Sequence, residues 1–176
     1  MAFQKQPPSC RDCPAYGKSR GFLPPETPPN PTFIFLSSGP SSNECYQGEV
    51  FSPHDRDGDT ITRWLYRAGL TKSQVALGHL VWCSLERPLK TKAGTTRRDP
   101  TQEELVACWQ RHSGPWLQQL CQQPGDKHII ALGPVPNRFL RGYTAKQAVD
   151  ALVGTTEKLT TLPEVKTLDG EASRSE

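Results

Sequence analysis

Short apolar runs alternate along the chain with segments in which apolar residues recur at helical spacing. Three of the runs contain β-branched or aromatic residues between polar or turn-forming flanks. This pattern predicts buried strands at residues 31–38 (PTFIFLSS), 73–84 (SQVALGHLVWCS) and 127–133 (KHIIALG).

Helical patterns fill the segments between these runs. In residues 59–70 the apolar side chains share one face, and Asp59 or Thr60 is expected to cap the helix. A second helix is expected at 99–123, because a capping-box pattern and acidic residues stand at its start. The Gly-Pro pair at 114–115 is expected to kink or split this helix. Two weaker helical patterns follow near 135–141 and 144–153.

The alternation of strands and helices predicts an α/β fold, a three-layer α/β/α domain with a central, mostly parallel sheet. We assign residues 1–158 to this domain and expect the polar tail, 159–176, to be disordered. Ligands of such sheets bind at the carboxyl ends of the strands. The segment 37–51 (SSGPSSNECYQGEVF), directly after the first strand, is therefore a candidate functional loop.

Composition narrows the functional classes. The 176 residues suit one domain, and the net charge of +3 means that any contact with nucleic acid must come from a local basic patch. No segment approaches the roughly 20 apolar residues of a membrane-spanning helix. The N-terminus has no apolar run like that of a signal peptide. We therefore expect a cytoplasmic protein with no membrane partner.

Six cysteines in a cytoplasmic chain suggest metal binding or reactivity rather than disulfide bonds. Four of them fall on separate predicted elements, namely a C-x2-C pair, the end of the second strand and the second turn of a helix: Cys10, Cys13, Cys83 and Cys108. Four such thiolates could hold zinc or an iron–sulfur cluster, and their spacing does not separate the two. The alternative is buried free thiols, which is our expectation for Cys45 and Cys121.

The stretch QGEVFSPHDRDGD, residues 47–59, gathers an aromatic ring, a histidine and three aspartates. Asp57 and Asp59 are interpreted as turn or helix-cap residues, and His54 as a solvated loop residue. Phe51 could contact a ligand or belong to the core.

A basic segment lies between two of the cysteines, in residues 85–98. It is expected to be a loop, and it could be either a solvated face or a contact for DNA phosphates. Its basic residues are Arg87, Lys90, Lys92, Arg97 and Arg98.

Taken in order, six segments resemble those of the iron–sulfur uracil-DNA glycosylases of families four and five, over roughly residues 8–142. Several motifs in the right order are more specific than any one of them. The segments are CRDCPAYGKSRGFLPP, FIFLSSGPSSNECYQGEVF, HDRDGD, HLVWCS, RRDPTQEELVACWQRHSGPWL and IIALGPVP.

The resemblance implies a 4Fe-4S cluster, with zinc as the alternative, held by the four cysteines on separate elements. The family role of the cluster is structural, because it holds the loops that face DNA. Phe51 matches the position whose ring stacks on a flipped uracil, and Asp55 matches the family-five aspartate that orients water or stabilises the sugar cation. Three more residues fall at base-binding positions: Ser38, Gly39 and His79. Backbone N–H groups around 39–42 would stabilise the leaving base anion, and Lys90, Lys92, Arg97 and Arg98 would bind DNA.

The chain departs from these families at defined points. Ser38 stands where family four has a glutamate, and His79 stands where family four has asparagine and family five has alanine. One extra residue, Pro53 or His54, precedes the HDRDGD match, and no late H-P-S segment occurs. The resemblance therefore implies a relative that is shortened at its C-terminus and divergent at its catalytic motifs.

Three functions remain open. The first is a DNA repair enzyme that removes uracil or a related deaminated base by cleaving the N-glycosidic bond. The second is a non-catalytic relative that binds DNA or a replication or repair protein. The third is a zinc-binding structural module without a role on DNA. Retention of Asp55 and Phe51 favours the first, and the missing H-P-S segment favours the second.

Overall fold

The computed structural model describes residues 3–88, 95–142 and 166–167. A central sheet has the strand order β2-β1-β5-β6, and all of its neighbouring strands are parallel. The strands are β1 (Phe33–Ser37), β2 (Ala76–His79), β5 (His128–Ala131) and β6 (Lys166–Thr167). The three predicted apolar runs thus supply the first three strands of this sheet.

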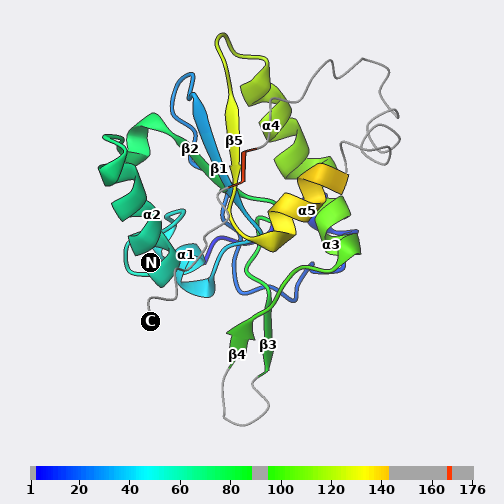
Figure 1. Ribbon diagram of the computed structural model, residues 1–176. Helices are drawn as coiled ribbons and strands as arrows, with labels where there is room; N and C mark the ends of the chain where they lie inside the picture. The colour runs from blue at the N-terminus through cyan, green and yellow to red at the C-terminus, as the bar shows by residue number, and fades with distance from the viewer. Residues whose placement is uncertain (1–2, 89–94, 143–165, 168–176) are drawn as a thin grey trace, which may run out of the picture.

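Helices cover both faces of the sheet (Figure 1). Side chains alternate across β1, so that Ile34 and Leu36 enter one core cluster and Phe35 enters another. The first cluster packs against α3 (Gln102–Cys108), α4 (Gly114–Cys121) and α5 (Pro134–Gly142). The second packs against α1 (Ser42–Gln47) and α2 (Arg56–Arg67). The predicted α/β fold with a mostly parallel sheet between helices is confirmed.

The long helix predicted at 99–123 is interrupted as expected, although the interruption is wider than a proline kink. Its capping box forms, because Glu104 N–H donates to Thr101 Oγ1 at 3.3 Å and Thr101 N–H donates to Glu104 Oε2 at 2.8 Å. Residues Trp109–Ser113 form a π-helical turn between α3 and α4. There, a Cβ on Gly114 would lie 2.6 Å from the carbonyl oxygen of Trp109, so this close turn requires glycine.

Two predicted boundaries were wrong. The helix expected at 59–70 begins at Arg56, with Asp55 at the N-cap, so Asp57 and Asp59 lie in its first turn rather than at its cap. The strand expected at 73–84 is reduced to β2, because a 3-10 turn precedes it and the chain then turns away from the sheet. Cys83 instead forms an isolated antiparallel bridge with Phe22 of the N-terminal segment.

The basic segment 85–98, expected to be a loop, forms an antiparallel hairpin of β3 (Glu86–Pro88) and β4 (Thr95–Arg97). This hairpin projects beyond the sheet in Figure 1. Lys90 and Lys92 lie outside the described residues.

The predicted helix at 135–141 is confirmed as α5, whereas the one at 144–153 falls outside the described residues. Within the tail expected to be disordered, Lys166–Thr167 pairs in parallel with β5. None of the helices in the described part of the chain is long and apolar enough to cross a membrane.

Candidate active site

The loop after β1 leads directly into α1 and is fixed by a capping box. Glu44 N–H donates to Ser41 Oγ at 3.0 Å, and Ser41 N–H donates to Glu44 Oε2 at 2.7 Å. Gly48 ends the helix with a φ of 70°. This local order places the loop at the carboxyl end of β1, where parallel sheets bind ligands.

Asp55 faces this loop from the start of α2. Its carboxylate accepts hydrogen bonds from the Ser41 hydroxyl and, at 2.7 Å, from Asn43 Nδ2. The side chain makes no capping bond to α2, although Asp55 occupies the N-cap. The carboxylate is therefore held by the start of α1 and does not cap α2.

Phe51 has an unusual backbone conformation, with a φ of 48°. Glu44 Oε1 accepts its N–H at 2.7 Å, and Lys72 Nζ donates to its carbonyl oxygen at 3.1 Å. Helix α2 also packs closely against this turn, since a Cβ on Gly58 would lie 2.0 Å from the carbonyl oxygen of Ser52. A left-handed backbone conformation is energetically unfavourable for an aromatic residue and is kept only where the surrounding contacts impose it. Such residues are frequent at functional sites.

His79 lies beneath Phe51 at the end of β2. Its Nδ1 is 2.6 Å from Ser37 Oγ, and the ring centroids of His79 and Phe51 are 5.2 Å apart. His79 Nε2 lies 3.5 Å from Glu44 Oε1, which is long for a hydrogen bond. Burial by itself would raise the pKa of Glu44, but His79 and the backbone N–H groups of Ser41 and Phe51 hold this pKa at about 2. Glu44 is thus an ionised centre around which the loop, Phe51 and His79 are arranged.

The predicted site residues are divided between this buried centre and an open pocket. Phe51 and His79 are 3% and 1% exposed, and Phe51 packs in the second core cluster, as its alternative interpretation predicted. Sequence reasoning singled out neither Glu44 nor Lys72 as a site residue. The Ser-x-x-Glu spacing of Ser41 and Glu44 was a visible signal for the first, whereas nothing local marks the second.

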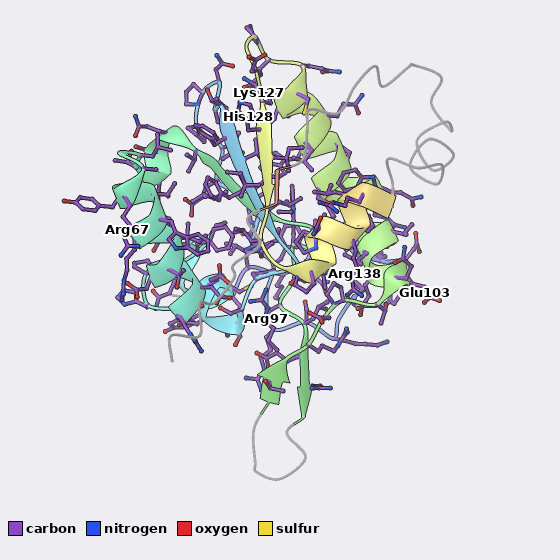
Figure 2. All side chains as sticks on the ribbon, viewed as in Figure 1. Arg67, Arg97, Glu103, Lys127, His128 and Arg138 are labelled. Atoms are coloured by element: carbon purple, nitrogen blue, oxygen red, sulfur yellow. The ribbon has the colours of Figure 1, made fainter. Side chains whose placement is uncertain are left out.

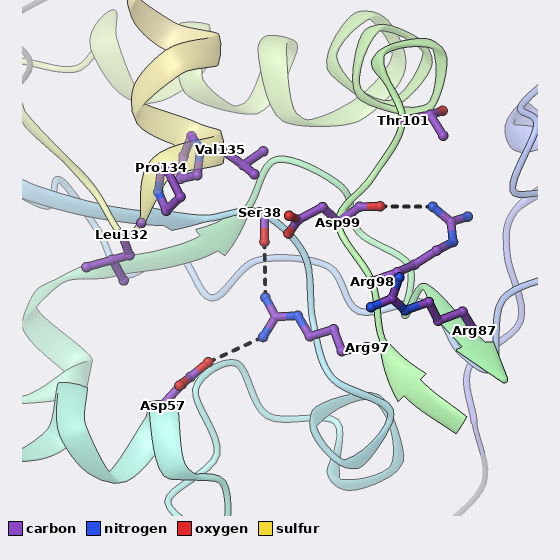
Figure 3. A pocket seen from close by; sticks show the side chains of 12 residues that line it. Ser38, Asp57, Arg87, Arg97, Arg98, Asp99, Thr101, Leu132, Pro134 and Val135 are labelled. Carbon is purple, nitrogen blue, oxygen red and sulfur yellow. Dashed lines mark hydrogen bonds and ion pairs between the residues drawn. The ribbon is translucent and has the colours of Figure 1, made fainter. Parts of the chain in front are cut away.

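An open pocket of about 720 Å³ lies beside this centre, and we call it the arginine pocket (Figure 3). Four segments contribute its walls: the loop after β1, the start of α2, the β3–β4 hairpin with the residues that follow it, and the segment after β5. It is lined by Ser38, Asp57, Arg87, Arg97, Arg98, Asp99, Thr101, Leu132, Gly133, Pro134, Val135 and Pro136.

Arg97 lines the arginine pocket and contacts three other residues there. It donates to the carbonyl oxygen of Gly39, to Ser38 Oγ at 3.2 Å and to Asp57 Oδ2 at 3.3 Å. Figure 2 shows Arg97 at the opposite end of the sheet from Lys127 and His128, which mark the start of β5. Two predicted base-binding residues, Ser38 and Gly39, are therefore in contact with a predicted DNA-binding residue.

Arg98 is engaged differently. Its guanidinium makes two short contacts with the Glu104 carboxylate, at 2.7 and 2.6 Å. The hydrogen bonds that Arg98 donates to this carboxylate raise the pKa of Arg98. Glu104 is buried, so this bidentate pair fixes the base of the hairpin to α3.

The four predicted cysteine ligands come close to one another, and two of them belong to the N-terminal segment. All four are free and buried: Cys10, Cys13, Cys83 and Cys108. Burial, followed by the nearby Cys108, Cys13 and Cys10, raises the pKa of Cys83. Burial, with Cys10 and Cys13 adding to it, raises the pKa of Cys108 to about 12. The four thiols therefore lie within electrostatic range of one another. Neither Cys45 nor Cys121, which were expected to be free thiols, is among the groups that shift the pKa of Cys83 or Cys108.

Polar donors surround these sulfur atoms. Trp82 N–H donates to Cys108 Sγ at 3.3 Å, and Gln6 Nε2 donates to Cys83 Sγ at 3.4 Å. His112 Nε2 lies 3.0 Å from Cys10 Sγ, and its ring stacks on Trp82 with centroids 5.1 Å apart. Donors to sulfur suit thiolates that carry charge, as they do in iron–sulfur proteins.

The spacing of the thiols bears on the type of metal centre. Among the described residues, no three Cys, His, Asp or Glu side chains form a group that could hold a metal ion. A single zinc ion requires sulfur atoms at about 2.3 Å from one point. In the described structure the four thiols do not form such a site.

The comparison with known proteins identifies the family. The family model described as Uracil DNA glycosylase superfamily matches residues 24–168, most of the chain. The chain belongs to this superfamily, and membership indicates a protein of the uracil-DNA glycosylase type that acts in DNA repair. Among curated proteins, none matches the chain significantly.

Proposed function

We propose that this protein is a DNA N-glycosylase that excises uracil or a related deaminated base. The single observation that carries this proposal is the orientation of Asp55. Its carboxylate lies near the carboxyl end of β1 and is held by Ser41, the N-cap of α1, and by Asn43 in the first turn of α1. Membership of the superfamily supplies the class of reaction.

The chemistry suits a carboxylate with a fixed orientation. Cleavage of an N-glycosidic bond develops positive charge on the sugar, and a carboxylate stabilises that charge or orients the attacking water. The two donors from α1 prevent Asp55 from turning away towards the start of α2. Asp55 therefore acts by electrostatics and orientation.

The departing base carries negative charge and needs hydrogen-bond donors. Ser41 N–H already donates to Glu44, so this group is occupied. We therefore assign stabilisation of the departing base to other hydrogen-bond donors of the loop after β1. Phe51 and His79 are buried in the described structure, so base capture by stacking requires this turn to open towards DNA.

The test is single-turnover release of base from uracil- and hypoxanthine-containing strands, single and double. Asp55→Asn keeps the size of the side chain and removes its charge, and we expect base release to fall about 10²–10³-fold while DNA binding persists. Asp59→Asn is the matched control, because Asp59 lies on the same helix and pairs with Arg63 away from the loop. Equal rates for wild type and Asp55→Asn would remove Asp55 from the mechanism.

A non-catalytic, DNA-binding relative is the second candidate. The observation in its favour is the burial of Phe51 and His79, which closes the predicted base-binding surface in the described structure. Tight DNA binding by the wild type without release of any base would establish this candidate in place of the first.

We also propose that Cys10, Cys13, Cys83 and Cys108 hold a 4Fe-4S cluster. The support is the convergence of four buried thiols with N–H donors to two of them. When bound, the cluster would supply structural cross-linking of the N-terminal segment, the segment after β2 and α3. The residues of this chain would keep water from the sulfur atoms.

Iron content and colour test the cluster. We expect brown protein with roughly four irons per chain, and loss of iron and of much of the fold in Cys83→Ser and Cys108→Ser. Cys45→Ser and Cys121→Ser are the controls and should keep the iron. Colourless protein with one bound zinc would overturn the cluster while keeping the ligands.

A further inference from the structure

The arginine pocket has the position, charge and size to receive part of a ligand. It opens between the ends of two neighbouring strands, since Ser38 follows β1 and Leu132 follows β5. Ligands of parallel sheets bind at such edges. Its arginines present planar donor forks that match the oxygen atoms of a phosphate.

The two central arginines of this pocket differ in how firmly they are held. Arg98 is paired bidentately with Glu104, whose side chain is 4% exposed. Arg97 is paired with Asp57 at 3.3 Å through one oxygen, and these side chains are 35% and 69% exposed. An exposed, single ion pair contributes little stability and is screened by salt. Arg97 can therefore exchange its partner at little cost in free energy, whereas exchange at Arg98 would break a bidentate pair with a buried carboxylate.

The partners of Arg97 connect the hairpin to the candidate active site. One guanidinium nitrogen contacts Ser38 and Gly39 on the loop after β1, and the other contacts Asp57 on α2 (Figure 3). Asp57 is two residues from Asp55. Arg97 thus bridges the two segments that hold the candidate catalytic carboxylate.

We infer that Arg97 is an exchangeable latch, which holds Asp57 in the free protein and releases it to take a backbone phosphate of the DNA strand in the arginine pocket. This inference rests on the proposed action on DNA and names the residue that senses the strand. In this exchange Arg97 leaves an exposed carboxylate and binds a DNA phosphate. Counterions of that phosphate are released, and their release favours binding at low salt. Asp57 is consequently a competitor of DNA for one arginine.

Competition of this kind predicts that removing the competitor tightens binding. We would measure the Kd of the full-length protein for a short labelled duplex without uracil, so that no turnover enters the result. Asp57→Asn should lower the Kd about three- to fivefold, the range expected from an exposed ion pair. Asp59→Asn makes the same change of charge two residues further along α2, on a carboxylate paired with Arg63, and should change the Kd by less than about twofold.

A second variant locates the effect in Arg97. Arg97→Ala should weaken binding and reduce the slope of log K against log salt by about 0.9, the value for one phosphate contact. In the Arg97→Ala background, Asp57→Asn should have no further effect beyond that of Asp59→Asn. Thermal unfolding checks that each variant folds.

The inference is overturned if Asp57→Asn and Asp59→Asn change the Kd equally, if the Asp57 effect persists without Arg97, or if Arg97→Ala leaves the salt slope unchanged. These outcomes are separate from failure of the proposed function. If the protein releases base but Asp57→Asn and Asp59→Asn have equal Kd values, only the latch is excluded. If the latch is found but no base is released, the glycosylase activity is excluded and the DNA contact stands.

Discussion

The acidic centre around Glu44 and the arginine pocket lie side by side, yet they are held by opposite means. The Glu44 carboxylate is buried and accepts backbone N–H groups at 2.7 Å on both of its oxygens. Arg97 makes its ion pair on the surface, through one oxygen of an exposed carboxylate. Buried charge with complete hydrogen bonding is costly to disturb, whereas an exposed pair is not. The first region is therefore suited to holding its segments in a fixed position, and the second to the exchange of partners inferred for Arg97.

The largest disturbance of the fixed region is expected at Gly58. A Cβ there would lie 2.0 Å from the carbonyl oxygen of Ser52 and 2.4 Å from that of Phe51, both of which are backbone atoms that cannot turn aside. We expect Gly58→Ala to lower the free energy of unfolding by about 2–3 kcal/mol, despite the better helix propensity of alanine. Chemical denaturation measures this change. Arg67→Ala, at the exposed end of the same helix, should stay within about 0.5 kcal/mol of wild type, and an equally small effect of Gly58→Ala would contradict the close packing.

The next effect concerns the charge of Glu44. Its pKa is lowered from 4.5 to about 2, so its ionised form stabilises the folded protein above pH 4.5, and this stability is lost as the pH falls towards 2. Glu44→Gln should cost at most about 3 kcal/mol at neutral pH. The stability of the variant should also depend less on pH between 4.5 and 2. Denaturation at several pH values measures both effects, and parallel pH profiles for wild type and variant would show that Glu44 is not the titrating group.

The smallest effect on stability is expected in the arginine pocket. Arg97→Ala removes an exposed ion pair and should lower the free energy of unfolding by less than about 1 kcal/mol. Thermal unfolding measures it. If Arg97→Ala destabilised the protein as much as Gly58→Ala does, the contrast between a fixed and an exchangeable region would fail.

Local sequence determines the parts of this fold that the patterns predicted. The apolar runs became β1, β2 and β5, because burial between two helical layers requires apolar residues at successive positions. The capping box of α3 was likewise visible, since Thr101 and Glu104 satisfy each other within four residues. The candidate site residues Asp55 and Phe51 were selected from their motif, and their roles stay predictions.

Contacts between distant segments decide what the patterns missed. The left-handed Phe51 depends on Lys72, twenty-one residues away, and on Glu44. Helix α2 starts early because Gly58 permits a close approach to Ser52, although glycine locally disfavours a helix. The β3–β4 hairpin carries a proline and few apolar residues, so its strand pairing has no signal in the hydrophobic pattern.

The π-helical turn between α3 and α4 has a consequence for changes in chain length. A π-turn is an α-helix that holds one extra residue, so its loss restores regular geometry without rotating the helix that follows. One residue deleted within Trp109–Ser113 would leave Leu117 and Leu120 facing the sheet. The same deletion inside α4 would rotate the remaining residues by about 100° and expose them. The chain can thus shorten at this turn, beside Cys108, with less cost than at any neighbouring position of either helix.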